Sequence, residues 1–131
     1  MPNKNIPHLS QNFYIDERGF LYFKLVNQEN CNILTIEKLN KLIVDVTSFC
    51  ENYYMPFLVD LRYASGVAGY STFKLLAKDI QLKSVCSKIS FIVNTLPLKI
   101  LIYNYIKIHK PHIHSQVFHD LDGGINFCLT S

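Results

Sequence analysis

The segment PFLVDLRYASGVAGYSTFKLLA, residues 56–77, brings charged, aromatic and hydroxyl side chains to the end of an apolar run. Asp60 and Arg62 stand at that end, and functional sites in parallel sheets cluster beyond the carboxyl ends of strands. Asp16, Glu17 and Asp60 are the carboxylates available for an acid/base set. General acid–base catalysis requires groups that converge on one proton, and nothing in the sequence places these carboxylates together. We therefore expect Asp60 to cap or to pair with Arg62 or a nearby lysine, and we predict no catalytic residue.

A second group of residues that could do chemistry is a histidine run with the spacing H-x2-H-x-H-x4-H. Its members are His109, His112, His114 and His119. Imidazoles are zinc ligands, and Cys128 or Asp120 could add a further ligand to such a site. Pro111 interrupts the run, however, and no ligand is fixed on regular structure. We expect exposed histidines in a loop between a helix and a strand, and we predict neither a metal nor a cofactor.

The hydroxyl groups of Ser71 and Thr72 follow a loop that contains Gly66 and Gly69. Glycine permits tight turns, and a serine oxygen accepts hydrogen bonds from the free N–H groups at the start of a helix. From the residues alone, Ser71 is therefore a natural N-cap of a helix that begins at about residue 70.

These residues lie on an alternating series of predicted elements. Two strand-like runs over 12–26 surround Glu17-Arg18-Gly19, where glycine suits a hairpin turn. The elements predicted after this hairpin are a helix over 35–52, a strand over 55–61, a helix over 70–85, a strand over 87–94, a helix over 96–110, a short strand around 116–118 and a short terminal helix. The alternation predicts an α/β fold with a mixed sheet of four or five strands, whose later strands are parallel. Residues 1–10 are predicted to be a flexible tail, and residues 11–131 a single domain.

Composition narrows the classes of function. Hydrophobic residues make up 49% of the 131-residue chain, so it is globular, and a net charge of +3 is too small to argue for nucleic acid. No apolar run approaches the roughly 20 residues that span a bilayer, so we expect no membrane insertion. The cysteines Cys31, Cys50, Cys86 and Cys128 form no C-x-x-C pair and have no clear histidine partner. We expect a reduced, cytoplasmic protein.

Two segments together resemble a known family. One is the segment 56–77, in which a buried strand ends in Val-Asp-Leu-Arg before a loop and a helix. The other is YNYIKIHKPHIHSQVFHDLDGGINFCL, residues 103–129, in which a helix is followed by Lys-Pro, a short strand, an acidic turn and a terminal helix. This arrangement resembles the STAS domains, and most of all the short bacterial proteins of the STAS/SEC14-like group, which share the fold of the anti-sigma factor antagonists.

The resemblance implies a regulatory protein-interaction module and not an enzyme. In the sigma-factor-regulating relatives, a serine at the start of the helix after the Asp-bearing strand is phosphorylated by a partner kinase, which adds a charge of about −1.5 to −2. Those relatives carry Asp-Ser-Ser-Gly, whereas this chain has Ala68-Gly69-Tyr70 there, with Ser71 and Thr72 just beyond. Ser71 and Thr72 are therefore the candidates for a phosphorylation switch.

The aromatic residues indicate where a partner or ligand would bind. Tyrosine buries area while keeping a polar tip, and the chain contains 8 Tyr and 9 Phe. The predicted partner or ligand surface consists of Asp60, Arg62, Tyr63, Tyr70 and Phe73. A helix as apolar as that over 96–109 is either packed into the core, which we favour, or exposes Ile100 or Tyr103 at a homodimer surface or at a groove for an apolar ligand.

The competing prediction is a carrier of a small apolar, lipid-like ligand, as the resemblance to SEC14-like proteins implies. A carrier requires a closed apolar cavity of about 300 Å3 or more. We expect such a cavity to be lined by Phe73, Leu76, Leu101 and Tyr105.

Overall fold

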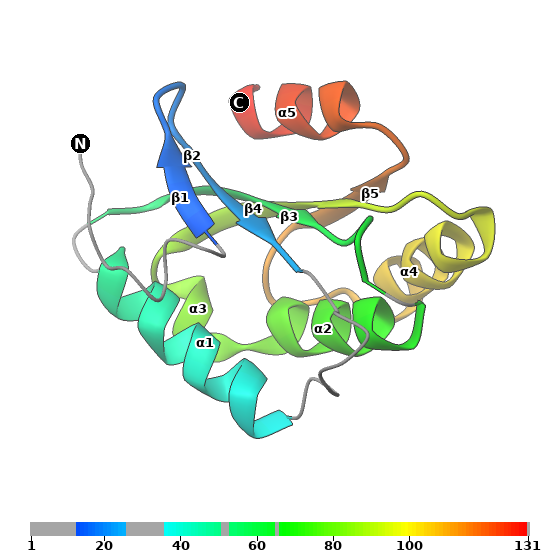
Figure 1. Ribbon diagram of the computed structural model, residues 1–131, viewed down its shortest axis with the longest axis horizontal. Helices are drawn as coiled ribbons and strands as arrows, with labels where there is room; N and C mark the ends of the chain where they lie inside the picture. Colours follow the sequence, from blue (N-terminus) through cyan, green and yellow to red (C-terminus); the bar gives the residue numbers. More distant parts are fainter. Residues whose placement is uncertain (1–12, 26–35, 51–52, 65, 131) are drawn as a thin grey trace.

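A five-stranded mixed sheet with the strand order β1-β2-β3-β4-β5 runs through the middle of the computed structural model, which describes residues 13–25, 36–50, 53–64 and 66–130 (Figure 1). The elements are β1 (Phe13–Asp16), β2 (Phe20–Lys24), α1 (Ile36–Phe49), β3 (Met55–Asp60), α2 (Gly66–Lys78), α3 (Ile80–Lys83), β4 (Cys86–Ile92), α4 (Leu96–His109), β5 (Ser115–Phe118) and α5 (Leu121–Leu129). β1 and β2 are antiparallel, and the strands from β2 to β5 are parallel. The predicted α/β class and mixed sheet are confirmed.

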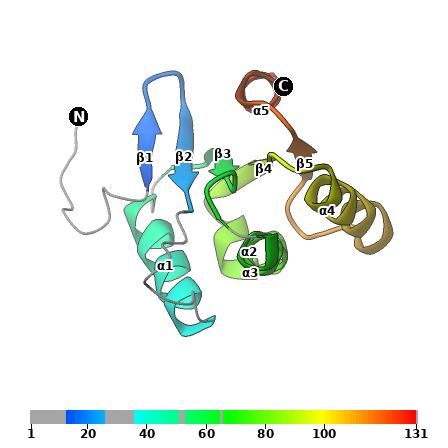
Figure 2. The same cartoon turned by 45° about the vertical axis from the view of Figure 1, so that its right-hand side comes forward.

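The helices cover the two faces of the sheet unequally. Helices α1 to α4 lie on one face, and α5 lies alone on the other (Figures 1 and 2). The larger core between the sheet and α1 to α4 includes Leu21, Phe23, Val59, Phe73 and Phe91. The smaller core under α5 includes Phe20, Leu58, Ile92 and Cys128. Because neighbouring strand residues point to opposite faces, Phe20 and Leu21 belong to different cores.

The N-terminal hairpin forms where the sequence predicts it. Gly19 has φ +105°, a conformation that favours glycine, and its N–H donates to the Asp16 carbonyl oxygen over 2.9 Å. Pro56 lies near the start of β3, where the pairing with β4 shifts register between Met55 and Phe57. The strand therefore accommodates a residue that has no N–H to donate.

The predicted helix over 70–85 is wrong at its start and in its middle. Helix α2 begins at Gly66, so Gly69 lies inside it, and a Cβ at Gly69 would meet Leu98 at 3.3 Å and Leu61 at 3.7 Å. Here glycine allows α2 to approach its neighbours closely, which is a different role from the predicted turn. Asp79 separates α2 from α3, because its side chain accepts a hydrogen bond from the Leu82 N–H over 2.8 Å.

The remaining predicted elements are present with small shifts of their ends. The predicted tail, residues 1–10, and the residue Cys31 lie outside the described residues. None of the described helices is long and apolar enough to cross a membrane.

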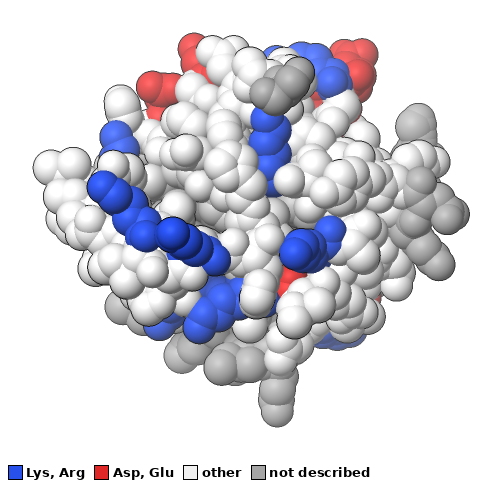
Figure 3. All heavy atoms as spheres, turned by 180° about the vertical axis from the view of Figure 1, so that it is seen from behind, with Lys and Arg blue, Asp and Glu red and all other residues white. Residues whose placement is uncertain are grey.

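Charged residues are distributed unevenly over one side of the molecule (Figure 3). Figure 3 shows the side opposite to that of Figure 1, where Lys and Arg atoms extend across much of the view and Asp and Glu atoms lie mainly along the top edge.

Candidate functional site

The candidate site begins with Asp60, the last residue of β3, whose side chain is fully buried. Its Oδ1 accepts hydrogen bonds from Arg62 N at 3.1 Å and Arg62 Nε at 2.9 Å. Its Oδ2 accepts from Arg62 Nη2 at 2.8 Å and Tyr22 Oη at 2.6 Å. Of the partners expected from the sequence, Arg62 or a nearby lysine, the structure shows Arg62, and the pair is bidentate.

The hydrogen bonds decide which protonation states the site holds. Burial by itself raises the pKa of Asp60, but the hydrogen bonds from Arg62 and Tyr22 outweigh it and leave this pKa below its usual value. Burial, together with the hydrogen bond to Asp60, raises the pKa of Tyr22 well above its usual value. At neutral pH the carboxylate is therefore charged and the phenol is protonated, so both groups are fixed in one state.

The next residue, Tyr63, is half exposed and is flanked by cations. The Lys24 Nζ lies 4.7 Å from the centroid of the Tyr63 ring, and the Arg62 Cζ lies 5.4 Å from it. Both cations attract the electron-rich face of the ring. Lys24, Arg62 and Tyr63 form what we call the Tyr63 surface.

Two connections fix this surface to the end of the sheet. The register between β2 and β3 places Lys24 opposite Asp60. The Asn94 side-chain amide, which follows β4, donates to the Arg62 carbonyl oxygen over 3.3 Å. Arg62 is thus tied to two neighbouring strands through its guanidinium and through its backbone.

The sequence contains a second Asp-x-Arg pair with the same local hydrogen bonds but a different environment. Asp16 Oδ1 accepts from Arg18 N at 2.8 Å and from Arg18 Nε at 2.9 Å, and Asp16 Oδ2 accepts from Arg18 Nη2 at 3.2 Å. The Arg18 side chain is 52% exposed, whereas that of Arg62 is 27% exposed over a fully buried Asp60. The two-residue spacing forms the pair at both sites, and burial together with the Tyr22 hydrogen bond distinguishes the Asp60 site.

Two residues of the predicted partner surface and one of the two predicted phosphorylation candidates are not at the surface. Asp60, Thr72 and Phe73 are all fully buried. Asp60 contributes to the surface indirectly, because its buried carboxylate holds the Arg62 guanidinium. The Phe73 ring packs edge-to-face on the Tyr105 ring, with 5.3 Å between centroids. Predicting them as surface residues was wrong, because the position of a residue near a loop does not fix the direction of its side chain.

The other predicted residues of this region are accessible to different degrees. Tyr63 and Ser71 are exposed, and Tyr70 is partly buried. Ser71 lies in the second turn of α2 and so is not the predicted N-cap. Because Thr72 is fully buried, a kinase cannot reach its hydroxyl in the folded protein. Ser71 remains as the accessible hydroxyl of the two.

Asp16 and Asp60, two of the carboxylates considered for an acid/base set, do not lie together. In the strand register, Asp16 on β1 lies opposite Phe20 on β2, and Asp60 on β3 lies opposite Lys24 on β2. The two carboxylates therefore lie near opposite ends of β2. Four residues along a strand separate these positions by about 13 Å.

The histidine run is divided by β5. His114 precedes this strand and His119 follows it, where His119 Nδ1 lies 3.3 Å from Lys99 Nζ. His109 packs against Tyr105 with 4.3 Å between ring centroids. In the part of the chain that the structure describes, no group of His, Cys, Asp and Glu is arranged to hold a metal ion.

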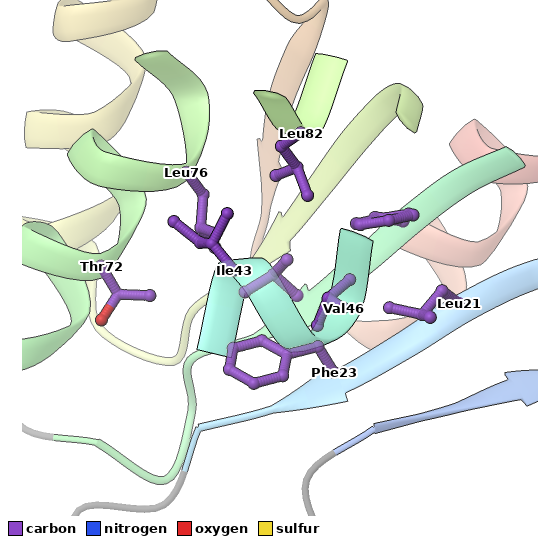
Figure 4. Close-up of a pocket in the computed structure, with 9 residues that line it drawn as sticks. Leu21, Phe23, Ile43, Val46, Thr72, Leu76 and Leu82 are labelled. Atoms are coloured by element: carbon purple, nitrogen blue, oxygen red, sulfur yellow. The ribbon is translucent and has the colours of Figure 1, made fainter. Parts of the chain in front are cut away.

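A pocket among the described residues differs from the predicted ligand cavity. It lies between the sheet and α1, α2 and α3 and has a cavity volume of about 20 Å3, close to the space that one water molecule requires (Figure 4). Of the four predicted lining residues, only Leu76 borders it, and Leu101 is half exposed on α4. Within the described residues, this space is too small for a lipid-like ligand.

Sequence reasoning missed Tyr22 and Lys24 as parts of the site. Both lie on one face of β2, and the alternation Phe20, Tyr22, Lys24 does show that they share a face. The sequence did not give the parallel register between β2 and β3, which brings Tyr22 and Lys24 to Asp60.

The fold of the chain is similar to that of a solved structure. The crystal structure of an uncharacterized DUF3478-family protein from Shewanella loihica PV-4, described as having a SpoIIAA-like fold, matches with a TM-score of 0.57 at 14% identity. The match covers 89% of this chain and 90% of that chain. At this identity the likeness concerns the fold alone, and it confirms the predicted STAS-like fold. The narrower resemblance to the STAS/SEC14-like group stays a prediction.

A second solved structure, a protein of unknown function from Arthrobacter sp. FB24, matches with a TM-score of 0.33 at 12% identity, over 92% of this chain and 100% of that chain. A TM-score this low does not establish a shared fold. No curated protein matches the chain significantly. Residues 13–130, which carry the whole sheet and all the helices described above, match the family model "Domain of unknown function (DUF7793)", and the chain therefore belongs to that family.

Proposed function

We propose that this protein is a non-enzymatic, cytoplasmic regulatory module that binds a partner protein through the Tyr63 surface. The observation that carries the proposal is an exposed tyrosine held between two cations, one of which is fixed by a buried carboxylate. Tyr and Arg are the residue types that contribute most often to the binding energy of protein interfaces.

Preorganisation supports the proposal. Immobilising a long side chain on binding costs roughly 0.5–1.5 kcal/mol, and Arg62 is already held through its guanidinium before a partner arrives. An exposed arginine without such a carboxylate would have to be ordered by the partner. The arrangement therefore favours binding over catalysis, because the Asp60 oxygens that could accept a proton are occupied by donors.

The partner should carry acidic groups. Lys24 and Arg62 supply positive charge at the rim of the Tyr63 ring, and Asp60 neutralises only part of it from below. Complementary charge across an interface increases the association rate and suppresses wrong partners.

Ser71 is the candidate site for control of this binding. It is exposed on α2 and precedes Lys74 by three residues, which places both on one side of the helix. A phosphate would add a charge of about −1.5 to −2 on the helix that follows the Tyr63 surface. The proposed switch uses Ser71 alone, since Thr72 is buried.

The test compares protein complexes captured from the natural host. Tagged wild-type protein, Tyr63→Ala and the control Tyr53→Ala are used as baits, and the bound protein is quantified by mass spectrometry. Tyr53 is also an exposed tyrosine, but it lies before β3 and outside the Tyr63 surface. We expect Tyr63→Ala to reduce the bound partner by about tenfold, as for an interface residue worth more than 1 kcal/mol, and Tyr53→Ala to have no effect.

Lys24→Glu provides an independent check, because it reverses a charge without removing the tyrosine. It should weaken the same partner and should shift association more than dissociation. The proposal is rejected when both Tyr63→Ala and Lys24→Glu retain the wild-type amount of partner while thermal unfolding shows that they are folded.

A further inference from the structure

The outer face of α4 combines exposed apolar side chains with positive charge. Its fourteen residues, LPLKILIYNYIKIH, contain two lysines and one histidine and no Asp or Glu. Leu98, Ile102 and Tyr105 are buried against the rest of the protein. The helix is thus anchored by one side, and the opposite side is free for contact within the described structure.

Four residues form a continuous line on that opposite side, which we call the α4 stripe. They are Leu96, Ile100, Tyr103 and Lys107, with exposed fractions of 66%, 49% and 50% for the three apolar members. Their spacing of four, three and four residues brings them together along one side of a helix. The Lys107 Nζ lies 5.5 Å from the centroid of the Tyr103 ring, so a cation is part of the stripe.

The charged groups of α4 and its C-cap are all basic, and the acidic Asp120 lies beyond Lys99, with its Oδ2 3.6 Å from the His119 ring that Lys99 contacts. Lys99 lies in the first turn of α4, and Lys107, His109 and Lys110 lie at its end. In Figure 3 the 180° turn brings α4 to the left, where Lys and Arg atoms cross that side with uncharged surface between them and Asp and Glu atoms lie above, at the top edge. A complementary partner must therefore be apolar along its centre and acidic at its edges.

This charge pattern argues against two copies of the chain meeting at the stripe. A twofold contact would place the lysines of one α4 against the other α4, which has no acidic residue to receive them. Like charges across an interface cost free energy. The line of side chains instead has the form of a ridge, and ridges pack into the grooves of another helix.

We propose that the α4 stripe is a docking surface for an acidic amphipathic helix of a partner protein. The partner helix places leucine-like side chains at i, i+4, i+7 and i+11 against Leu96, Ile100 and Tyr103. Its flanking Glu or Asp residues pair with Lys99, Lys107 and Lys110. The α4 stripe shares no residue with the Tyr63 surface, so variants can test the two proposals independently, although Asn94, two residues before Leu96, is hydrogen-bonded to Arg62.

The experiment uses a synthetic helical peptide of about 18 residues, which is about five turns. Leucines occupy one side at the spacing given above, glutamates flank them, and a fluorescent label reports binding by anisotropy. A second peptide carries lysines in place of the glutamates. We expect the glutamate peptide to bind the wild-type protein at least tenfold more tightly than the lysine peptide does.

Variants of the protein test whether the glutamate peptide binds at the α4 stripe. Ile100→Ala and Tyr103→Ala should each weaken the glutamate peptide about tenfold, whereas the matched controls Ile80→Ala and Tyr54→Ala should leave it unchanged, because Ile80 and Tyr54 are exposed elsewhere. Lys107→Glu should weaken the glutamate peptide and strengthen the lysine peptide. Tyr63→Ala should have no effect, which separates this proposal from the proposed function.

Three results would overturn the inference. The first is that the glutamate peptide fails to bind the wild-type protein more tightly than it binds Tyr103→Ala, which includes a failure to bind at all. The second is binding of the protein to mixed phosphatidylcholine–phosphatidylglycerol vesicles that Tyr103→Ala abolishes, which would assign the stripe to a membrane surface. The third is a dimer, measured by light scattering, that Ile100→Ala dissociates. Circular dichroism of each variant shows that it is folded.

Discussion

Asp60 and Asp16 show how one local motif has two energetic outcomes. Each carboxylate accepts the same set of hydrogen bonds from an arginine two residues later. Asp60 is buried and also accepts from Tyr22, whereas the Asp16 pair lies at the exposed tip of the hairpin. Water competes for the charges at Asp16 but not at the oxygens of Asp60. The same pair therefore organises a site in one place and a turn in the other.

We expect Asp60→Ala to destabilise the protein by about 3 kcal/mol, because it leaves the Arg62 guanidinium and the Tyr22 hydroxyl without their acceptor. This figure is at the low end for a buried pair, since Arg62 retains some contact with water. Urea unfolding of both variants measures the difference, and Asp16→Ala, the matched control, should shift the midpoint much less. Equal shifts for the two variants would contradict the distinction between the sites.

At the scale of elements, α5 lies on the sheet because Gly124 lacks a side chain. An added Cβ would collide with Ile92 Cδ1 and would lie 2.6 Å from Ser90 Oγ, both on β4. Alanine in place of glycine gains up to about 1 kcal/mol of helix propensity, but overpacking a core typically costs about 1–3 kcal/mol. Because α5 approaches β4 so closely, the cost of overpacking exceeds the gain in helix propensity, and the net effect on stability is unfavourable.

We therefore expect Gly124→Ala to lower the free energy of unfolding by about 1 kcal/mol. The atom nearest to the added Cβ is Ile92 Cδ1, which Ile92→Val removes, whereas Ser90 Oγ remains. Ile92→Val alone should cost about 0.5–1.5 kcal/mol, and on the Gly124→Ala background it should cost less or stabilise. A double-mutant cycle by urea unfolding measures this coupling, and strict additivity would show that α5 moves away instead of clashing.

At the scale of the whole molecule, titrating groups limit stability at both ends of the pH range. The pKa of Asp60 is lowered in the folded protein, so its contribution is present above the unfolded pKa near 3.9 and is lost as the pH falls below it. Asp16 has a lowered pKa too, through its hydrogen bond with Arg18, and acts in the same range. The pKa of Tyr22 is raised, so its contribution is lost as the pH rises above about 10.

The buried thiols also lower the stability of the folded protein at alkaline pH. Burial raises the pKa of Cys50 to about 11 and that of Cys128 to about 12, and it also raises that of Cys86. Free thiols titrate near 8.5, so these groups begin to oppose folding above about that pH. The loss of stability in alkali should therefore begin below the range of Tyr22 and steepen through it.

The measurement is the urea midpoint as a function of pH. We expect a plateau around neutral pH, with falls below about pH 4 and above about pH 8.5. Asp60→Asn should flatten the acid fall and Tyr22→Phe should flatten only the part above about pH 10, because the thiols remain. An acid fall of unchanged size in Asp60→Asn would show that other carboxylates control it.

Much of this fold could be predicted from local patterns. The hairpin at Gly19, the buried strand before Asp60 and the helix that starts near Pro97 each follow from residues within a few positions of one another. The site could be predicted only in part. The Asp60–Arg62 pair is local, but Tyr22 is 38 residues away and joins it through the register of β2 against β3.

The errors have the same physical origin. Ser71 and Thr72 are neighbours in sequence, yet one step along a helix turns a side chain by about 100°, which exposes Ser71 and buries Thr72. Gly69 was predicted to make a turn, but the nearness of Leu61 and Leu98 gives it a place inside α2. The sequence by itself determined the order of the elements and the local ion pairs, because these depend on short-range periodicity and spacing. The tertiary structure decided which side chains are buried, which carboxylates are shielded and which face of α4 is free, because these depend on contacts between segments far apart in the chain.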